Sequence, residues 1–164
     1  MANDRTGARA AVMAFFAPPA VANLNTIHKA WPRLNPWADY TAGQPAGTQS
    51  GAVGVVHLAR DDERRLSTGL AGTGAKKRID YEVELQVILR STKLSPDDAV
   101  DDYDAVIDGI KARLRSNQTL ASPDVWQAGE GDTWGEHADP SITPEGAIEV
   151  SGAVHFQITQ QINI

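Results

Sequence analysis

The segment GLAGTGAKK, which begins at Gly69, has the composition of a phosphate-binding loop. Such a loop needs a glycine, four further residues and then Gly-Lys-Ser/Thr, and it must open a helix whose first N–H groups bind the phosphate. Here Gly74 is followed by Ala75 and a lysine pair, and the residues after that pair alternate as in a strand. The dinucleotide pattern GxGxxG also fails, because Lys77 stands at its third glycine position. We therefore expect no nucleotide site.

The other residue types that could do chemistry are scattered along the chain. The histidines show no HExxH spacing and, since the chain has no cysteine, no thiolate support; they are His28, His57, His137 and His155. No GxSxG nucleophile elbow surrounds any of Ser50, Ser67, Ser91 or Ser151. Neighbouring carboxylates such as Asp97 and Asp98 look like the start of a helix, where they suit the helix dipole. We expect no catalytic residue, no metal site and no cofactor.

Length and composition indicate one globular domain that spans residues 1–164. No apolar run approaches the roughly 20 residues that cross a bilayer. The apolar stretch 10–17 is short and Asp4 precedes it, so it predicts a helix rather than a signal peptide. The formal net charge of −6 disfavours general affinity for nucleic acids, which bind chiefly to excess Lys and Arg. We expect a soluble cytosolic protein.

The final residues, 148–164, alternate between apolar and polar side chains and predict a long half-buried strand. One face carries Ile148, Val150, Val154, Phe156, Ile158, Ile162 and Ile164. The other carries Glu149, Ser151, His155, Gln157, Thr159, Gln161 and Asn163. Gly152 offers a place for a bend or bulge. Two placements are open: the strand lies centrally in the sheet, or another subunit covers it.

The rest of the chain predicts two helices and several shorter strands. A helix is expected at 6–17, before Pro18 and Pro19, and a strand at 26–31 is followed by an ordered loop with Trp37 and Tyr40. Strands at 52–60 and 77–90 form a long antiparallel hairpin at about 52–90, with a polar, glycine-rich connection. A short strand near 124–128 and a loop up to Gly146 precede the final strand.

The second helix has the clearest start and the clearest buried stripe. Ser95 caps it, Pro96 occupies its first turn, and Lys111, Arg113 and Arg115 suit its negative end. The stripe is Val100, Tyr103, Ile107, Ile110 and Leu114, and we expect it to pack on Val83, Leu85, Val87, Val154, Phe156 and Ile158. Hairpin-joined strands with two helices on one face make the fold class α+β, with a mostly antiparallel mixed sheet.

Two charged features have no explanation in local structure. Positive charge gathers around the hairpin tip at Arg60, Arg64, Arg65, Lys76, Lys77 and Arg78. These residues form either a solvated loop with interspersed acids or a loop that docks on an acidic partner surface. On the second helix, four acids at steps of four, three and four form one stripe: Asp97, Asp101, Asp104 and Asp108. The helix dipole fades beyond the first turn, so Asp104 and Asp108 are either solvated or meet cations of a neighbouring chain.

Taken together, this arrangement resembles the tail terminator proteins of phages with long, non-contractile tails. The resemblance covers the helix at 6–17, the hairpin segments ERRLSTG (63–69) and GAKKRIDY (74–81), the helix end IKARLR (110–115), the segment VWQAGE (125–130) and the closing strand. It rests on the order of these parts along the whole chain rather than on a catalytic motif. The Arg- and Ala-rich, Lys-poor composition fits a phage of a high-GC host.

The resemblance implies a structural virion protein with a mixed sheet and helices on one face. Such proteins form a hexameric ring that caps the finished tail tube, ends its polymerisation and provides the surface that joins the head. The implied partners are other copies of the chain, the major tail tube protein and the head–tail connector, while DNA passes through the lumen without specific binding. The implied location is the head-proximal end of the virion tail, after synthesis in the host cytoplasm, with no enzyme activity, cofactor or membrane.

The family has no strict functional-residue motif, so partner contacts are assigned by region only. They are Arg64, Arg65, Lys76, Lys77 and Arg78 on the hairpin, and Asp104 and Asp108 on the helix. Two other function classes stay open. A neck or head-completion connector would touch packaged DNA through the basic hairpin, and an enzymatic or ligand-binding domain would need a pocket of converging polar groups. Mass in solution and the identity of flanking genes would separate the three.

Overall fold

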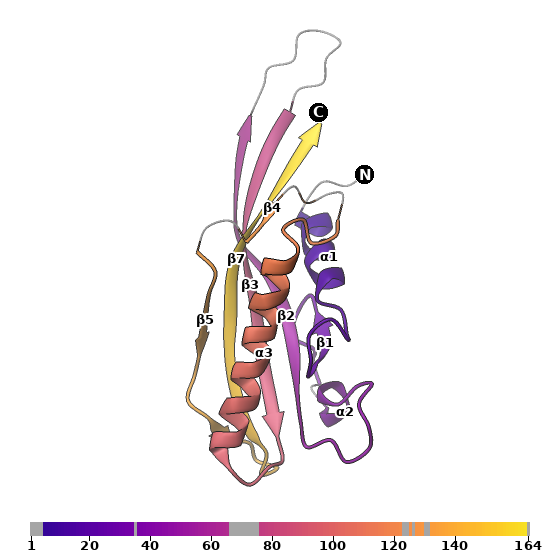
Figure 1. Ribbon diagram of the computed structural model, residues 1–164, viewed down its shortest axis with the longest axis vertical. Coiled ribbons are helices and arrows are strands. Elements are labelled where there is room, and N and C mark those ends of the chain that lie inside the picture. The colour runs from indigo at the N-terminus through magenta and orange to yellow at the C-terminus, as the bar shows by residue number, and fades with distance from the viewer. Residues whose placement is uncertain are drawn as a thin grey trace.

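Three long strands form the centre of the molecule. The structure is a computed structural model, and it describes residues 5–34, 36–65, 76–122, 125, 127–129 and 132–163. They are β2 (Ser50–Arg65), β3 (Lys76–Ser91) and β7 (Ile148–Asn163), each 16 residues long (Figure 1). β3 pairs antiparallel with both others along nearly its whole length. The predicted hairpin of β2 and β3 is therefore extended to a three-stranded sheet by β7, the last strand in the sequence.

Four short strands extend this ribbon into a seven-stranded sheet with the order β1-β2-β3-β7-β4. β1 (Leu24–His28) runs parallel to β2, and every other pairing is antiparallel. On the outer edge of β7 lie β4 (Gln127–Ala128), β5 (Trp134–His137) and β6 (Ser141–Ile142). The sheet is mixed and mostly antiparallel, as the sequence predicts.

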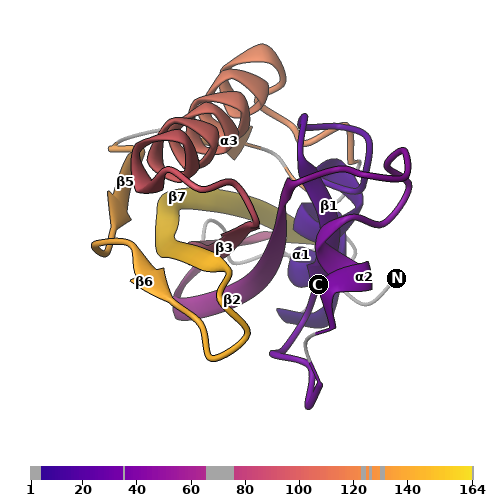
Figure 2. The same ribbon diagram turned by 90° about the horizontal axis from the view of Figure 1, so that it is seen from below.

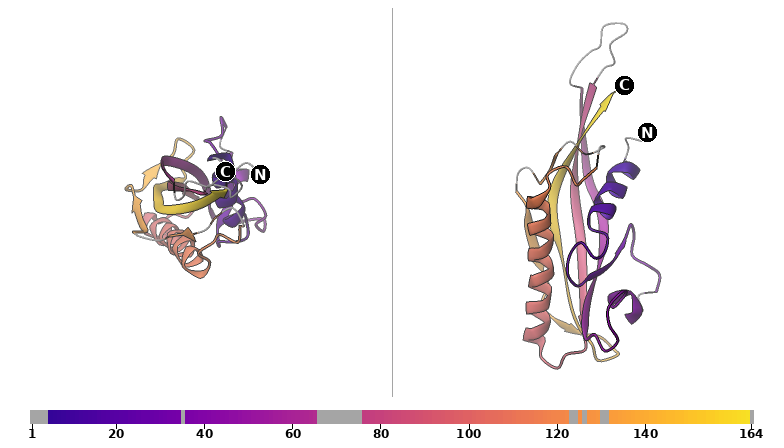
Figure 3. Two further views of the ribbon diagram at one scale, coloured as in Figure 1. Left: turned by 90° about the horizontal axis from the view of Figure 1, so that it is seen from above. Right: turned by 45° about the vertical axis from the view of Figure 1, so that its right-hand side comes forward.

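Two helices pack on one face of this sheet and confirm the α+β class. They are α1 (Arg5–Phe15) and α3 (Pro96–Ser116), and α3 lies lengthwise along the strands (Figures 1 and 3). The cap of α3 is the predicted one, since the Ser95 side chain accepts a hydrogen bond from the Asp98 N–H. Phe16, just after α1, contacts Phe156 of β7 edge-on, with ring centroids 6.1 Å apart. Both helices thus share the apolar face of the three long strands.

The core contains the predicted helix stripe and its predicted partners. Four residues of α3 are buried in one cluster with six residues of β3 and β7: Tyr103, Ile107, Ile110 and Leu114 with Val83, Leu85, Val87, Val154, Phe156 and Ile158. The fifth stripe residue, Val100, is partly buried against the same cluster. Periodicity alone therefore identified the correct face of this helix.

The final strand lies centrally in the sheet of its own chain, the first of the two predicted placements. β3 lies on one side of it, and β4, β5 and β6 lie on the other. Its apolar residues up to Ile158 are covered within the same chain. The register between β3 and β7 runs through Gly152 without a shift, so the strand has no β-bulge at that position. Gln160 lies on the apolar side, fully buried, and its amide has no hydrogen-bond partner among the described residues.

Several element boundaries differ from the sequence prediction. β2 continues through the polar residues 61–65, which had been assigned to the connection, because each pairs with a residue of β3. β1 begins and ends earlier than the predicted strand 26–31, and a short helix, α2 (Trp37–Tyr40), stands in the predicted loop. β5 and β6 stand in the other predicted loop, and of the strand predicted at 124–128, residues 127 and 128 form β4 whereas Val125 is not in a strand. The hairpin tip, 66–75, lies outside the described residues.

Candidate interaction surfaces

The distal ends of the three long strands extend past both helices (Figures 1 and 3). We call this part, residues 62–65, 76–80 and 159–163, the distal ribbon. The strand register gathers the predicted cations there, with Arg64 directly opposite Arg78 and Arg65 opposite Lys77. Like charges placed opposite each other destabilise a strand pair. All of the predicted cations except Arg60 thus lie at this end of the hairpin.

Acidic residues of the same ribbon balance much of that charge. Arg78 donates from Nε to both carboxylate oxygens of Asp80, at 2.8 and 3.0 Å, and Arg64 lies 3.2 Å from Asp62. Lys77 is ion-paired with Glu63. The ribbon surface thus carries alternating charges rather than a uniform basic patch, which agrees with the interspersed acids noted in the sequence. Arg60 lies below the ribbon, opposite Glu82. The Arg65 side chain is outside the described part of the structure.

The distal ribbon has an open edge on each side. β1 pairs with β2 only from Ala52 to Val55, and no other described strand pairs with that edge farther out. On the opposite edge, the pairing of β7 with β4 ends at Thr159, and residues 160–163 have no described strand beside them. Unpaired backbone N–H and C=O groups on such edges are a template for pairing with another chain.

The acidic stripe of α3 is exposed, as expected. Asp97, Asp101, Asp104 and Asp108 all face solvent, and none forms an ion pair with another described residue. The stripe continues with cations, because Lys111 follows three residues after Asp108 and Arg115 follows four residues later. Sequence reasoning assigned those cations to the helix end. The same steps of three and four could have shown that they share the stripe with the acids.

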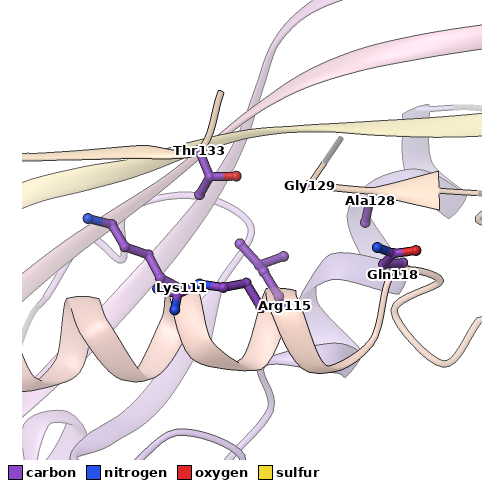
Figure 4. A pocket seen from close by; sticks show the side chains of 7 residues that line it. Lys111, Arg115, Gln118, Ala128, Gly129 and Thr133 are labelled. Atoms are coloured by element: carbon purple, nitrogen blue, oxygen red, sulfur yellow. The ribbon is translucent and has the colours of Figure 1, made fainter. Parts of the chain in front are cut away.

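Two hollows lie along this stripe, between α3 and residues 128, 129, 133, 135 and 136. The acidic hollow, about 270 Å³, is lined by Tyr103, Asp104, Ile107, Asp108, Lys111, Gly135 and Glu136. The basic hollow, about 170 Å³, is lined by Lys111, Leu114, Arg115, Gln118, Ala128, Gly129 and Thr133 (Figure 4). Lys111 lies at their boundary, since it lines both. The charge sign therefore changes from one hollow to the next along a single helix.

The polar face of the sheet carries a chain of hydrogen bonds around its histidines. Gln86 accepts from the Trp31 indole N–H at 2.8 Å, donates to Glu84 at 2.7 Å and lies 3.2 Å from His57 Nε2. Farther along, His155 stacks on Trp134, with ring centroids 3.8 Å apart, and its Nε2 lies 3.2 Å from Glu136.

These contacts fit structural histidines. Among the described residues, no three His, Asp or Glu side chains come together as ligands for a metal ion.

The sites expected from sequence therefore lie in two separate places. The hairpin cations are on the distal ribbon, whereas Asp104 and Asp108 are on the middle turns of α3. Within the described residues, no helix combines the length and the apolar character that crossing a membrane requires. No protein-family model matches the chain, and no curated protein is similar to it.

Proposed function

We propose that this chain is a structural virion protein, a tail terminator of a phage with a long non-contractile tail. Copies of it form a hexameric ring on the finished tail tube, stop tube polymerisation and provide the surface to which the head connector binds. The proposal is supported by the order of helices, hairpin and closing strand along the whole chain, and by the α+β fold with both long helices on one face.

One observation carries the proposal: among the described residues, the distal ribbon is a three-stranded sheet that is open on both edges. The outer edge of β2 and the outer edge of β7 lie on opposite sides of it. Pairing of the β7 edge of one copy with the β2 edge of the next is a heterologous contact. Such contacts generate a closed ring when the rotation between neighbours allows it. The ribbon also extends past both helices (Figure 3).

Only one of the two edges carries charge. Acids and bases alternate along the outer strand β2, as in Asp62 and Arg64. The open end of β7 is uncharged, since it consists of Gln160, Gln161, Ile162 and Asn163. Pairing of the two edges would therefore depend on backbone hydrogen bonds, and the charges of β2 define the surface that this edge presents to a neighbour.

The first test is electron microscopy and mass photometry of the purified full chain, with and without tail tubes. Rings of six copies that attach to tube ends are expected. Replacing two exposed ribbon cations, Arg64→Glu with Lys76→Glu, should abolish rings and tube attachment while the circular dichroism spectrum stays unchanged. Arg33→Glu, an exposed position in the loop after β1, is the matched control and should keep both. Tube attachment that survives the ribbon variant would contradict the proposal.

The second test is deletion of the gene in the phage that encodes it. Overlong tails without heads are expected, because tube polymerisation would lack its stop. Tails of normal length beside heads that fail to retain DNA would instead identify a head-completion connector.

A further inference from the structure

We propose that the exposed face of α3 forms a two-fold contact with α3 of a second copy. The observation behind it is the order of charges along one stripe: Asp104, Asp108, Lys111 and Arg115. Aligned antiparallel about a point between Gly109 and Ile110, Asp104 faces Arg115 of the second copy and Asp108 faces its Lys111. Because the contact is symmetric, the same two pairs form a second time. The stripe is its own complement, so the partner that fits it is another copy of this chain.

The two hollows beside α3 can receive the charged side chains of the second copy. In the antiparallel arrangement the long side chains of Lys111 and Arg115 of one copy reach the acidic hollow of the other, where Asp104, Asp108 and Glu136 line the walls. The short carboxylates of Asp104 and Asp108 reach the basic hollow, where Gln118 and Thr133 add polar groups to the two cations. A charged group inside a hollow is less screened by solvent than one on an open surface.

The rest of the exposed helix face permits close approach. Ala105 and Ala112 lie on this face and are exposed, and their small side chains leave room for a second helix. None of the four stripe charges forms an ion pair with another residue in the described part of the chain. They are therefore available to a partner without first breaking a contact recorded inside the subunit. α3 itself runs along the outside of the molecule (Figure 2).

This contact differs in kind from the one proposed to close a ring. A two-fold contact is isologous, whereas neighbours in a ring use two different surfaces. α3 runs along the long axis of the molecule, so antiparallel helices would direct the two distal ribbons in opposite directions (Figures 1 and 3). The inference therefore describes the free protein as a dimer with both ribbons accessible. It stands whether or not the ribbons form a ring.

The test is sedimentation equilibrium of the full chain together with two charge-reversed variants. The acidic variant, Lys111→Glu with Arg115→Glu, and the basic variant, Asp104→Lys with Asp108→Lys, should each dimerise at least about tenfold more weakly than wild type, because every pair becomes repulsive. A 1:1 mixture of the two variants should form a heterodimer. The fourfold reversal, which combines all four changes, should dimerise again, since it restores every pair with exchanged signs.

The matched control is Asp139→Lys, which makes the same charge change at an exposed position outside α3 and should dimerise like wild type. Thermal unfolding checks that each variant is folded. A wild-type monomer up to millimolar concentration would overturn the inference, and so would a dimer that neither reversal weakens. A mixture of the two variants that fails to associate would also overturn it. None of these variants changes a residue of the distal ribbon. A negative result for the dimer would therefore not contradict the proposed ring, which has separate tests.

Discussion

The hydroxyl of Tyr103 lies in the space that a side chain at Gly152 would fill. A Cβ on Gly152 would overlap both this hydroxyl and the carbonyl oxygen of Glu136, to which the hydroxyl donates a 3.0 Å hydrogen bond. One residue of α3, one of β5 and one of β7 thus meet at a single point. Glycine at position 152 is required for this close approach rather than for a β-bulge.

Gly152→Ala should therefore destabilise the fold by about 1–3 kcal/mol, as when extra atoms are forced into a packed site. The added methyl group has to displace either Tyr103 or the backbone of β5. Urea denaturation measures the loss, and Ser151→Ala, at a partly exposed neighbouring position, serves as the control. A change below about 0.5 kcal/mol would mean that β5 is free to move away from β7.

Tyr103 also predicts a pH dependence. Burial raises the pKa of its hydroxyl well above the ordinary value, and the nearby charges of Asp104 and Glu136 act in the same direction. The folded state therefore favours the protonated form. Its contribution to stability is complete below the unfolded-state pKa of about 10 and falls by up to about 1.4 kcal/mol per pH unit above it, until the folded-state pKa is reached. Stability should drop between pH 10 and 11.

Tyr103→Phe isolates this effect. At pH 7 the variant should lose about 1 kcal/mol, because the Glu136 carbonyl loses its donor. At pH 11 the difference from wild type should shrink, since phenylalanine has no proton to release on unfolding. Parallel stability curves for the two proteins from pH 7 to 11 would contradict the assignment.

Ile110 tests the packing of α3 on the sheet. Its side chain is fully buried in the core cluster, so Ile110→Ala should cost about 2–5 kcal/mol. Leu94→Ala is the matched truncation at a fully exposed position and should change stability by less than about 0.5 kcal/mol. Chemical denaturation of the three proteins gives both values. Equal losses of stability for the two variants would mean that Ile110 does not pack against the sheet.

The sequence predicted most reliably the elements whose hydrophobic pattern is long. Alternation over β3 and β7 and the helical spacing from Tyr103 to Leu114 each repeat often enough to exclude other readings. β5 and β6 are too short to show a period, and they are strands because the outer edge of β7 pairs with them. The polar end of β2 is a strand for the same reason, since β3 supplies its hydrogen-bond partners. Pairing between distant segments leaves no local pattern to read.

The candidate surfaces were predicted in part for a related reason. Spacing alone placed Asp104 and Asp108 on one exposed stripe, and clustering in sequence placed Arg64 and Arg78 at one end of the hairpin. Spacing could not show the two hollows, because their far walls, formed by residues 128, 129, 133, 135 and 136, are brought to α3 by the fold. The ion pairs that balance the hairpin cations also depend on strand register, which the sequence left unspecified.

Arg113 of α3 makes two contacts with Phe15 of α1, and we expect both contacts to stabilise the packing of the two helices. Its Nε donates a 2.8 Å hydrogen bond to the carbonyl oxygen of Phe15, the last residue of α1, and its guanidinium lies 4.5 Å from the centre of the Phe15 ring. A lysine cannot reproduce both contacts, because its ammonium is compact and does not stack as a planar group. Arg113→Lys should cost about 1–2 kcal/mol.

Arg115→Lys makes the same substitution on the same helix, at an exposed position without an ion pair among the described residues, and should be nearly neutral. Hydrogen exchange adds a local measurement. Amides of α1 should exchange faster in Arg113→Lys, while those of β3 keep their protection, because β3 is held by strands on both sides. Unchanged exchange in α1 would show that the helix is held by its other contacts. These are the buried residues Ala8, Ala11, Val12 and Phe15, and Arg5, which pairs with Asp61 and donates to the Leu58 carbonyl oxygen.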